Sequence, residues 1–173
     1  MKRVVCLMVM IILTLVPCSC VNGGVTMFFG DNDNRLADAR MEELFDAVKR
    51  QNKGAIKELF SEKAIDEAGD VDSKIDHLLS FVQGKLVSWD RDGSSMVLDT
   101  VKYGNKKKQL ITWYTLYTDE QNYLVFLVDY PIDKIDSKNV GLYSIRILRA
   151  ENENKLEGTV EEWVIPGIYI LDN

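Results

Sequence analysis

Three charged residues lie in stretches whose other residues are mostly apolar, and they are the first candidates for chemistry. Asp99, Asp129 and Arg146 each occur in phase with the apolar residues of an expected strand. A charged side chain on a buried face is costly unless it is paired or functional. In a pocket, Asp99 or Asp129 could therefore serve as a general base. The alternative is a position at the solvated end or on the outer face of a strand.

Other reactive residue types are scarce, which excludes several kinds of site. His77 is the only histidine, and it lies away from the apolar face of its expected helix, which predicts a surface position. Cys6, Cys18 and Cys20 are the only cysteines, so the chain beyond them has no thiol, disulfide or cysteine–zinc site. The sequence also has no phosphate-binding glycine loop, nucleophile elbow or zinc-protease histidine pair.

One group of acids has part of the spacing of a calcium-binding loop. Asp31, Asp33 and Glu42 stand at positions 1, 3 and 12 of such a loop, but Leu36 occupies position 6, where the turn needs glycine. We therefore expect no metal and no cofactor.

Large aromatic side chains form a second candidate site. Together with one arginine, they could line a pocket for a small apolar or amphipathic ligand: Phe81, Trp113, Tyr114, Tyr117, Phe126, Tyr143 and Arg146. The alternative is ordinary packing within the sheet and the core. Residues two apart in a strand share a face, but the pattern does not fix which face points inward.

The first twenty residues have the order of an export signal. Lys2 and Arg3 precede an apolar run over Val4–Val16, which is shorter than the roughly 20 residues of a membrane-spanning helix. Cys18, with Leu15 three positions before it, resembles the lipobox cysteine of bacterial lipoproteins. The resemblance implies that Cys18 carries the lipid.

Pro17 departs from the small residue usually found before a lipobox cysteine, so Cys20 is the alternative site of lipidation. Free secretion and an uncleaved anchor are the other two alternatives. We expect a signal peptide with lipobox over residues 1–20, a tether over 21–34 and one domain over 35–173. The expected location is extracytoplasmic, on the cell membrane.

The charge of the chain is acidic. The formal net charge is −6, and loss of Lys2 and Arg3 with the leader makes the mature chain more acidic still. This charge excludes nucleic acid as a partner and argues against electrostatic docking of the whole body on an anionic membrane. The lipid would have to provide the anchoring.

The elements that must position these residues are helices first and strands afterwards. Apolar residues recur at helical spacing over Leu36–Arg50, over Ala55–Phe60 and from Asp72 to Val82, and Ser61 is expected to cap a further helical turn.

Beyond Gly84 the apolar period changes to two, which predicts strands. The expected strands are Lys85–Asp90, Ser95–Tyr103, Gln109–Thr118, Asn122–Tyr130, Gly141–Ala150 and Val160–Leu171. Short turns such as Asp92-Gly93 would make consecutive strands antiparallel neighbours. The predicted fold class is α+β, with N-terminal helices packed on a curved antiparallel sheet of about six strands.

Four short segments carry a resemblance to a known family. They are Phe81-Val-Gln-Gly84-Lys, Tyr117-Thr118 ahead of Tyr123, Gly141-Leu-Tyr-Ser-Ile145 and Trp163-Val-Ile-Pro166-Gly167-Ile168. They resemble small bacterial lipoproteins with a domain of unknown function in the nuclear-transport-factor-like superfamily, which includes ketosteroid isomerase and the polyketide cyclases. The resemblance covers about Leu36 to Asn173. It implies a cone-shaped domain with a pocket between helices and sheet, and often a dimer through the sheet.

These observations favour a membrane-tethered, non-catalytic binding module. Its expected partners are the membrane, through a lipid anchor, and either a small apolar or amphipathic ligand or a protein, with a homodimer through the sheet as a further expectation. The alternative is an isomerase, dehydratase or cyclase with an in-pocket carboxylate base, although no catalytic pattern of that superfamily matches residue by residue. A purely structural role in the envelope is the third alternative, and it predicts a cone that is filled by side chains.

Overall fold

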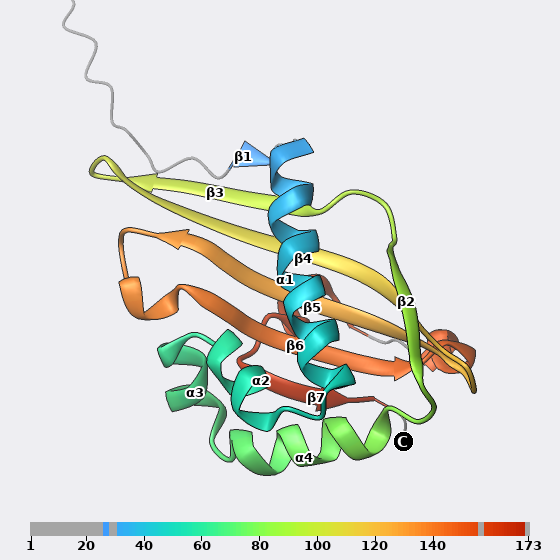
Figure 1. The fold of residues 1–173 in the computed structure, drawn as a ribbon. Helices are drawn as coiled ribbons and strands as arrows, with labels where there is room; N and C mark the ends of the chain where they lie inside the picture. The colour runs from blue at the N-terminus through green and yellow to red at the C-terminus, as the bar shows by residue number, and fades with distance from the viewer. Residues whose placement is uncertain (1–25, 28–30, 156–157, 172–173) are drawn as a thin grey trace, which may run out of the picture.

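The computed structural model of the chain describes residues 26–27, 31–155 and 158–171 (Figure 1). The predicted signal peptide and its two candidate lipidation sites, Cys18 and Cys20, lie outside the described residues. Four helices come before the main strands: α1 (Asp31–Lys49), α2 (Lys53–Leu59), α3 (Glu62–Ala68) and α4 (Val71–Phe81).

The starts of the short helices follow from side-chain caps. The Asn52 side chain accepts a hydrogen bond from the amide of Ala55 and starts α2, and Ser61 does the same for α3 as predicted. Asp70 caps α4 at the amide of Ser73, so this helix begins slightly before the expected Asp72.

One mixed sheet contains all the described strands. They are β1 (Thr26–Met27), β2 (Leu86–Arg91), β3 (Met96–Lys102), β4 (Asn105–Thr118), β5 (Asn122–Asp133), β6 (Gly141–Arg149) and β7 (Gly167–Ile170). The order is β1-β3-β4-β5-β6-β7, with β2 also paired to β4, and only β6 and β7 run parallel. The predicted α+β class with N-terminal helices on a curved sheet is confirmed.

Two expectations about the strands are wrong. Asp92-Gly93 does not turn a hairpin: Trp89 of β2 lies opposite Leu116 and Met96 of β3 lies opposite Ile111, so both strands follow one edge of β4. Residues 92–95 separate two strands that lie one after the other along the same side of β4, so β2 and β3 do not pair with each other.

The last expected strand, Val160–Leu171, begins with a short helix instead of a strand. Its first residues form α5 (Val160–Trp163), where the Glu162 carboxylate accepts a hydrogen bond from the amide of Thr159 at 2.7 Å. This N-terminal contact competes with extended structure. Only Gly167–Ile170 joins the sheet, and it does so parallel to β6 because α5 and its flanking residues carry the chain back.

The predicted tether, residues 21–34, is partly inside the fold. Thr26 and Met27 pair with Asp99 and Leu98 of β3, and α1 begins at Asp31, five residues before the expected start. The N-terminal region of the domain is therefore attached to the sheet edge.

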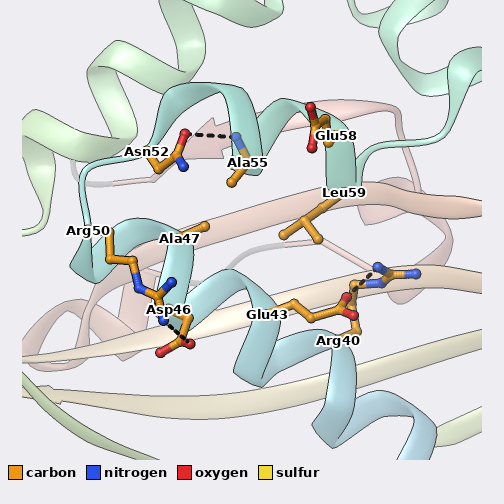
Figure 2. A pocket seen from close by; sticks show the side chains of 9 residues that line it. All are labelled: Arg40, Glu43, Asp46, Ala47, Arg50, Asn52, Ala55, Glu58 and Leu59. Carbon is orange, nitrogen blue, oxygen red and sulfur yellow. Dashed lines mark hydrogen bonds and ion pairs between the residues drawn. The ribbon is translucent and has the colours of Figure 1, made fainter.

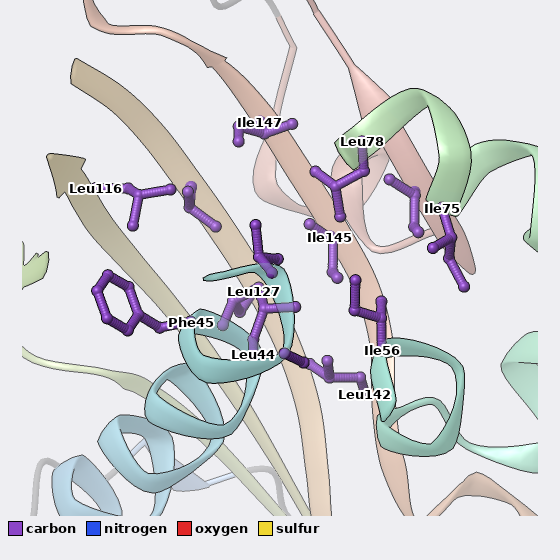
Figure 3. Packing of buried hydrophobic residues seen from close by; sticks show 14 of the residues in the cluster. Leu44, Phe45, Ile56, Ile75, Leu78, Leu116, Leu127, Leu142, Ile145 and Ile147 are labelled. Carbon is purple, nitrogen blue, oxygen red and sulfur yellow. The ribbon is translucent and has the colours of Figure 1, made fainter. Parts of the chain in front are cut away.

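The main core lies between the helices and one face of the sheet. α1 crosses this face while α2, α3 and α4 lie along the β6–β7 side (Figure 1). Buried residues of the helices, such as Leu44, Ile56 and Leu78, pack against Leu127 and Ile145 of the sheet (Figure 3). Burial of these side chains is the main stabilising term of the fold.

The junction of α2 and α3 lies directly on β6. The amide of Ser61 donates a hydrogen bond to the carbonyl of Leu142 at 2.9 Å. Gly141 has φ 126°, and a Cβ there would lie 2.9 Å from the Ser61 nitrogen. Only glycine permits this close approach, so Gly141 fixes the helical layer to the sheet.

A second, smaller cluster occupies the opposite face. Phe126 and Val128 of β5 are fully buried there. Trp163 and Val164, which lie in the connection between β6 and β7, cover them. The sheet is therefore apolar on both faces along β5.

Candidate functional site

The side of α1 that faces the sheet carries polar residues among its apolar ones. Asp33, Ala37 and Arg40 are spaced four and three apart, which places them on one side of the helix. Each of the two charged residues finds a partner on the sheet. Arg40 pairs with the candidate carboxylate Asp129, and Asp33 pairs with Lys108, which in turn lies near the other candidate carboxylate, Asp99.

Asp129 lies on β5 beneath α1 and its side chain is 6% exposed. The Nε of Arg40 donates a hydrogen bond to its Oδ1 at 2.9 Å. Burial raises the pKa of this carboxyl above its usual value, and the Arg40 guanidinium opposes that rise. Asp129 is therefore the buried partner in an ion pair with Arg40.

Tyr114 belongs to the next polar cluster on the same face. Its fully buried side chain donates a hydrogen bond to Asp38 of α1 at 3.4 Å, and Asp38 also pairs with Arg91 of β2. Burial, with the Asp38 carboxylate beside it, raises the pKa of the Tyr114 hydroxyl. Tyr114 is thus held as a protonated hydrogen-bond donor.

Asp99 lies on β3, toward the N-terminal end of α1. Its carboxylate is 3.1 Å from the Nζ of Lys106 and 3.7 Å from that of Lys108, and Lys108 also pairs with Asp33. Asp33 and Arg40 are seven residues apart on α1, about 10 Å along the helix. The two candidate bases thus attach to different turns of α1 and do not share one ion-pair network.

The aromatic candidates are divided between the two faces of the sheet. Tyr114 and Phe81 lie on the side of the helices, where the Phe81 and Tyr123 rings meet at 5.4 Å. Trp113 and Phe126 lie on the other side, with ring centres 4.7 Å apart.

Of the three remaining candidates, Tyr117 and Arg146 lie on the face of the sheet opposite the helices, and Tyr143 lies between the two apolar clusters. Tyr117 is two residues from Thr115 and four from Trp113, so it shares their face. The Nε of Arg146 donates to the carbonyl of Trp163 at 3.0 Å, and its guanidinium stacks 4.6 Å from the ring centre of Tyr169.

Tyr143 packs against both clusters, and its hydroxyl hydrogen-bonds Glu67 of α3 at 3.1 Å. Burial and this carboxylate raise the pKa of the Tyr143 hydroxyl to about 12. Since the seven candidates face two sides of the sheet, they do not line one pocket.

The space between helices and sheet is filled by side chains. A void of about 20 Å³ remains among Leu44, Phe45, Leu116 and their neighbours, and another of about 10 Å³ lies beside Asp129 and Tyr114. Voids of this size hold about one water molecule at most. The implied cone pocket is closed to a small ligand in this structure.

An open groove lies outside this interior, between α1 and α2 (Figure 2). Its volume is about 470 Å³, and its lining residues are Arg40, Glu43, Asp46, Ala47, Arg50, Asn52, Ala55, Glu58 and Leu59. Its apolar lining comes from Ala47, Ala55 and Leu59, and charged side chains surround these three residues.

The charges of the groove are arranged in pairs along α1. Arg40 donates to Glu43 at 2.6 Å, and Arg50 donates to Asp46 at 2.9 Å. Sequence reasoning missed this groove, although the spacing of three and four residues between opposite charges indicates pairs on an exposed helix face. What it could not supply was the placement of α2 beside that face.

Metal-ligating clusters are not found among residues 26–27, 31–155 and 158–171. Within the same described part of the chain, no helix is both long and apolar enough to cross a membrane. His77 is exposed on α4, as its position in the sequence predicts.

The fold and the groove together define a small α+β domain with a filled interior and an open, charged external groove. Residues 43–150 match the family model described as "Domain of unknown function (DUF5104)". The chain belongs to this family. A comparison with curated proteins gives no match. The matched segment begins within α1 and ends just after β6, so it includes most of the groove and the central strands.

Proposed function

We propose that this protein is an extracytoplasmic, lipid-anchored bacterial lipoprotein that acts as a non-catalytic binding module for a protein partner. The observation that carries the choice of partner is the contrast between the filled interior and the open groove of about 470 Å³ between α1 and α2. A small apolar ligand needs an enclosed apolar pocket. A protein segment needs an accessible surface with an apolar centre and a polar rim, as the groove provides.

The chemistry of the groove favours a peptide segment with small apolar side chains and charges of both signs. Leu59 and Ala55 offer apolar contact, while Glu58, Asp46 and Arg50 can pair with complementary charges. The existing pair of Arg50 and Asp46 is exposed, so exchanging it for an intermolecular pair costs little.

The proposal extends to location and superfamily. The leader with Cys18, or the alternative Cys20, supports export and lipidation, and the acidic body leaves the anchoring to the lipid. The order of helices before a curved sheet, with α1 across one face, supports membership of the nuclear-transport-factor-like superfamily. A homodimer through the sheet remains a prediction.

The enzymatic alternative has less support. The raised pKa of Asp129 suits a general base, but Arg40 pairs with it and the adjoining void is about 10 Å³. Asp99 is likewise engaged by Lys106 and Lys108.

Site-specific photo-crosslinking in the bacterial envelope tests the binding proposal. A benzophenone amino acid at Glu58, on the rim of the groove, should yield a covalent adduct with one protein of defined mass. The matched control places the same amino acid at His77, which is exposed on α4 outside the groove. We expect no such adduct from position 77. The change Asp46→Lys should weaken the adduct from position 58 several-fold, since it reverses a charge of the groove.

Mass spectrometry of the purified protein provides the opposing outcome. A small molecule that remains bound under native conditions and is lost on denaturation would favour the small-ligand alternative. Equal protein adducts from positions 58 and 77 would contradict a specific role of the groove.

A further inference from the structure

The end of the sheet formed by the β3–β4 hairpin exposes apolar and basic side chains together. Tyr103 at the turn is 93% exposed, and Val101 and Ile135 are 49% and 44% exposed. The amide of Lys134 donates to the carbonyl of Lys106 at 2.8 Å, which places the chain after β5 beside the hairpin. We call this surface the hairpin end. Its residues are Val101, Lys102, Tyr103, Lys106, Lys134 and Ile135.

The hairpin end is basic although the protein is acidic. Within the part of the chain that the structure describes, Lys102 and Lys134 have no carboxylate within ion-pair distance. Lys106 shares Asp99 with Lys108. Local positive charge on an acidic protein is suited to an anionic surface.

Tyr103 breaks a local rule of turn chemistry. Lys102 pairs with Asn105, so Tyr103 and Gly104 form a two-residue turn, with φ of 50° and 78°. Such turns favour asparagine or aspartate followed by glycine, because a bulky residue is strained at positive φ. The ring recovers little of this cost within the fold, since its one described ring contact is Lys102 at 5.8 Å. An exposed tyrosine beside lysines is, however, typical of the interface between a membrane and water.

The N-terminal attachment lies next to this hairpin (Figure 1). Thr26 of β1 pairs with Asp99 of β3, and β1 runs antiparallel to β3, so the N-terminal end of β1 is the end nearer to the turn. Asp99 and Tyr103 are four residues apart, about 13 Å along a strand. Cys20 precedes Thr26 by six residues, a path of at most about 21 Å. With Cys18 as the lipidated residue the limit is about 28 Å.

We propose that the hairpin end rests on the anionic phospholipid bilayer, with Tyr103 at the level of the headgroups and the lysines against their phosphates. This inference rests on the proposed lipid anchor and adds a second point of membrane contact. The acyl chains hold the protein at the surface, and the hairpin end fixes which side of the domain faces the bilayer. Two contacts of this kind bind more firmly than one acyl anchor alone.

Photo-crosslinking of the full chain to lipid tests the orientation. The protein is produced with its leader in bacteria, with a benzophenone amino acid at position 103, and phospholipid adducts are measured by mass spectrometry. The matched control carries the same amino acid at Glu120, in the turn at the opposite end of β4. We expect phospholipid adducts from position 103 and at least several-fold fewer from position 120.

Reversing the charge of a lysine tests whether the lysines attract the phospholipids or whether position 103 is merely close to the bilayer. Lys102→Glu, combined with the crosslinker at position 103, should reduce the phospholipid adducts several-fold. Lys85→Glu changes an exposed lysine just before β2 and should leave the phospholipid adducts unchanged. Equal effects of the two changes would overturn the role of the lysines.

The outcomes distinguish this inference from its premise. An acylated protein in the membrane fraction that gives equal adducts from positions 103 and 120 would overturn the proposed orientation and leave the anchor intact. A chain without an acyl group in the soluble fraction would overturn the anchor, and the orientation with it.

Discussion

Asp133 ends β5 and collects several hydrogen bonds at one carboxylate. The amides of Ile135 and Asp136 donate to Oδ1 at 2.9 and 2.8 Å, and the side-chain amide of Asn139 donates to Oδ2 at 3.0 Å. Burial alone would raise the pKa of Asp133, but these hydrogen bonds and the charge of Lys107 bring it below the usual 3.8. The ionised carboxylate therefore stabilises the β5–β6 connection.

The sign of the shift gives the pH dependence. A lowered pKa in the folded state means that the stabilisation is complete above pH 3.8 and is lost as the pH falls through the lower, folded-state pKa. Asp133→Asn should reduce the free energy of unfolding by about 1–3 kcal/mol at neutral pH. Urea unfolding should show a much smaller difference in strong acid. Asp66→Asn, at an exposed position, is the control, and a loss for Asp133→Asn that did not shrink in acid would contradict this role.

Tyr103 provides a second test on a single residue. Relief of its positive φ predicts that Tyr103→Asn raises the free energy of unfolding by up to about 1 kcal/mol. Tyr103→Phe keeps the same backbone cost and should leave thermal stability unchanged. Destabilisation by Asn would show that the ring contributes to the fold instead.

Among the elements, α1 carries ion pairs that differ in burial: one joins the helix to the sheet, and another lies at its own exposed C-terminal end. Arg40 pairs with Asp129, whose side chain is 6% exposed, whereas Arg50 and Asp46 are 72% and 47% exposed. Removing one partner of a buried pair leaves an uncompensated charge, so Arg40→Met should cost about 3 kcal/mol near neutral pH. Arg50→Met should cost at most about 0.5 kcal/mol.

The pH dependence of the Arg40→Met cost tests whether the charge of Arg40 holds α1 on the sheet. Without Arg40, burial raises the pKa of Asp129 further, so protonation neutralises the carboxyl as the pH falls. The cost of Arg40→Met should therefore be smaller near pH 4 than at neutral pH in denaturant titrations. A loss of the same size at both pH values would indicate that the aliphatic part of Arg40, rather than its charge, holds α1.

The helices and strands themselves could largely be predicted from the sequence, but their arrangement in space could not. Period and caps are local, so the four helices before the sheet, the Ser61 cap and five of the expected strands were predictable from neighbouring residues. The placement of β2 and β3 along one edge of β4 depends on pairing with distant residues. Arg40 and Asp129 are likewise 89 residues apart, and nothing local indicates that they meet. The groove depends on the same kind of non-local packing.

At the scale of the whole molecule, the body is closed inside and offers function only at its surface. The groove between α1 and α2 and the hairpin end lie on different parts of the domain, so membrane contact and partner binding need not compete. Both proposals require that the chain is held at a membrane.

Single substitutions at the two leader cysteines test that requirement. Leu15 stands three positions before Cys18, as in a lipobox, whereas Pro17 stands three positions before Cys20. We therefore expect Cys18→Ala to release the protein from the membrane fraction and to abolish labelling by a fatty-acid analogue, while Cys20→Ala retains both. The reverse pattern would move the lipid to Cys20. Retention of both variants in the membrane without label would indicate that the uncleaved leader is the anchor, since an apolar run can hold a chain without acylation.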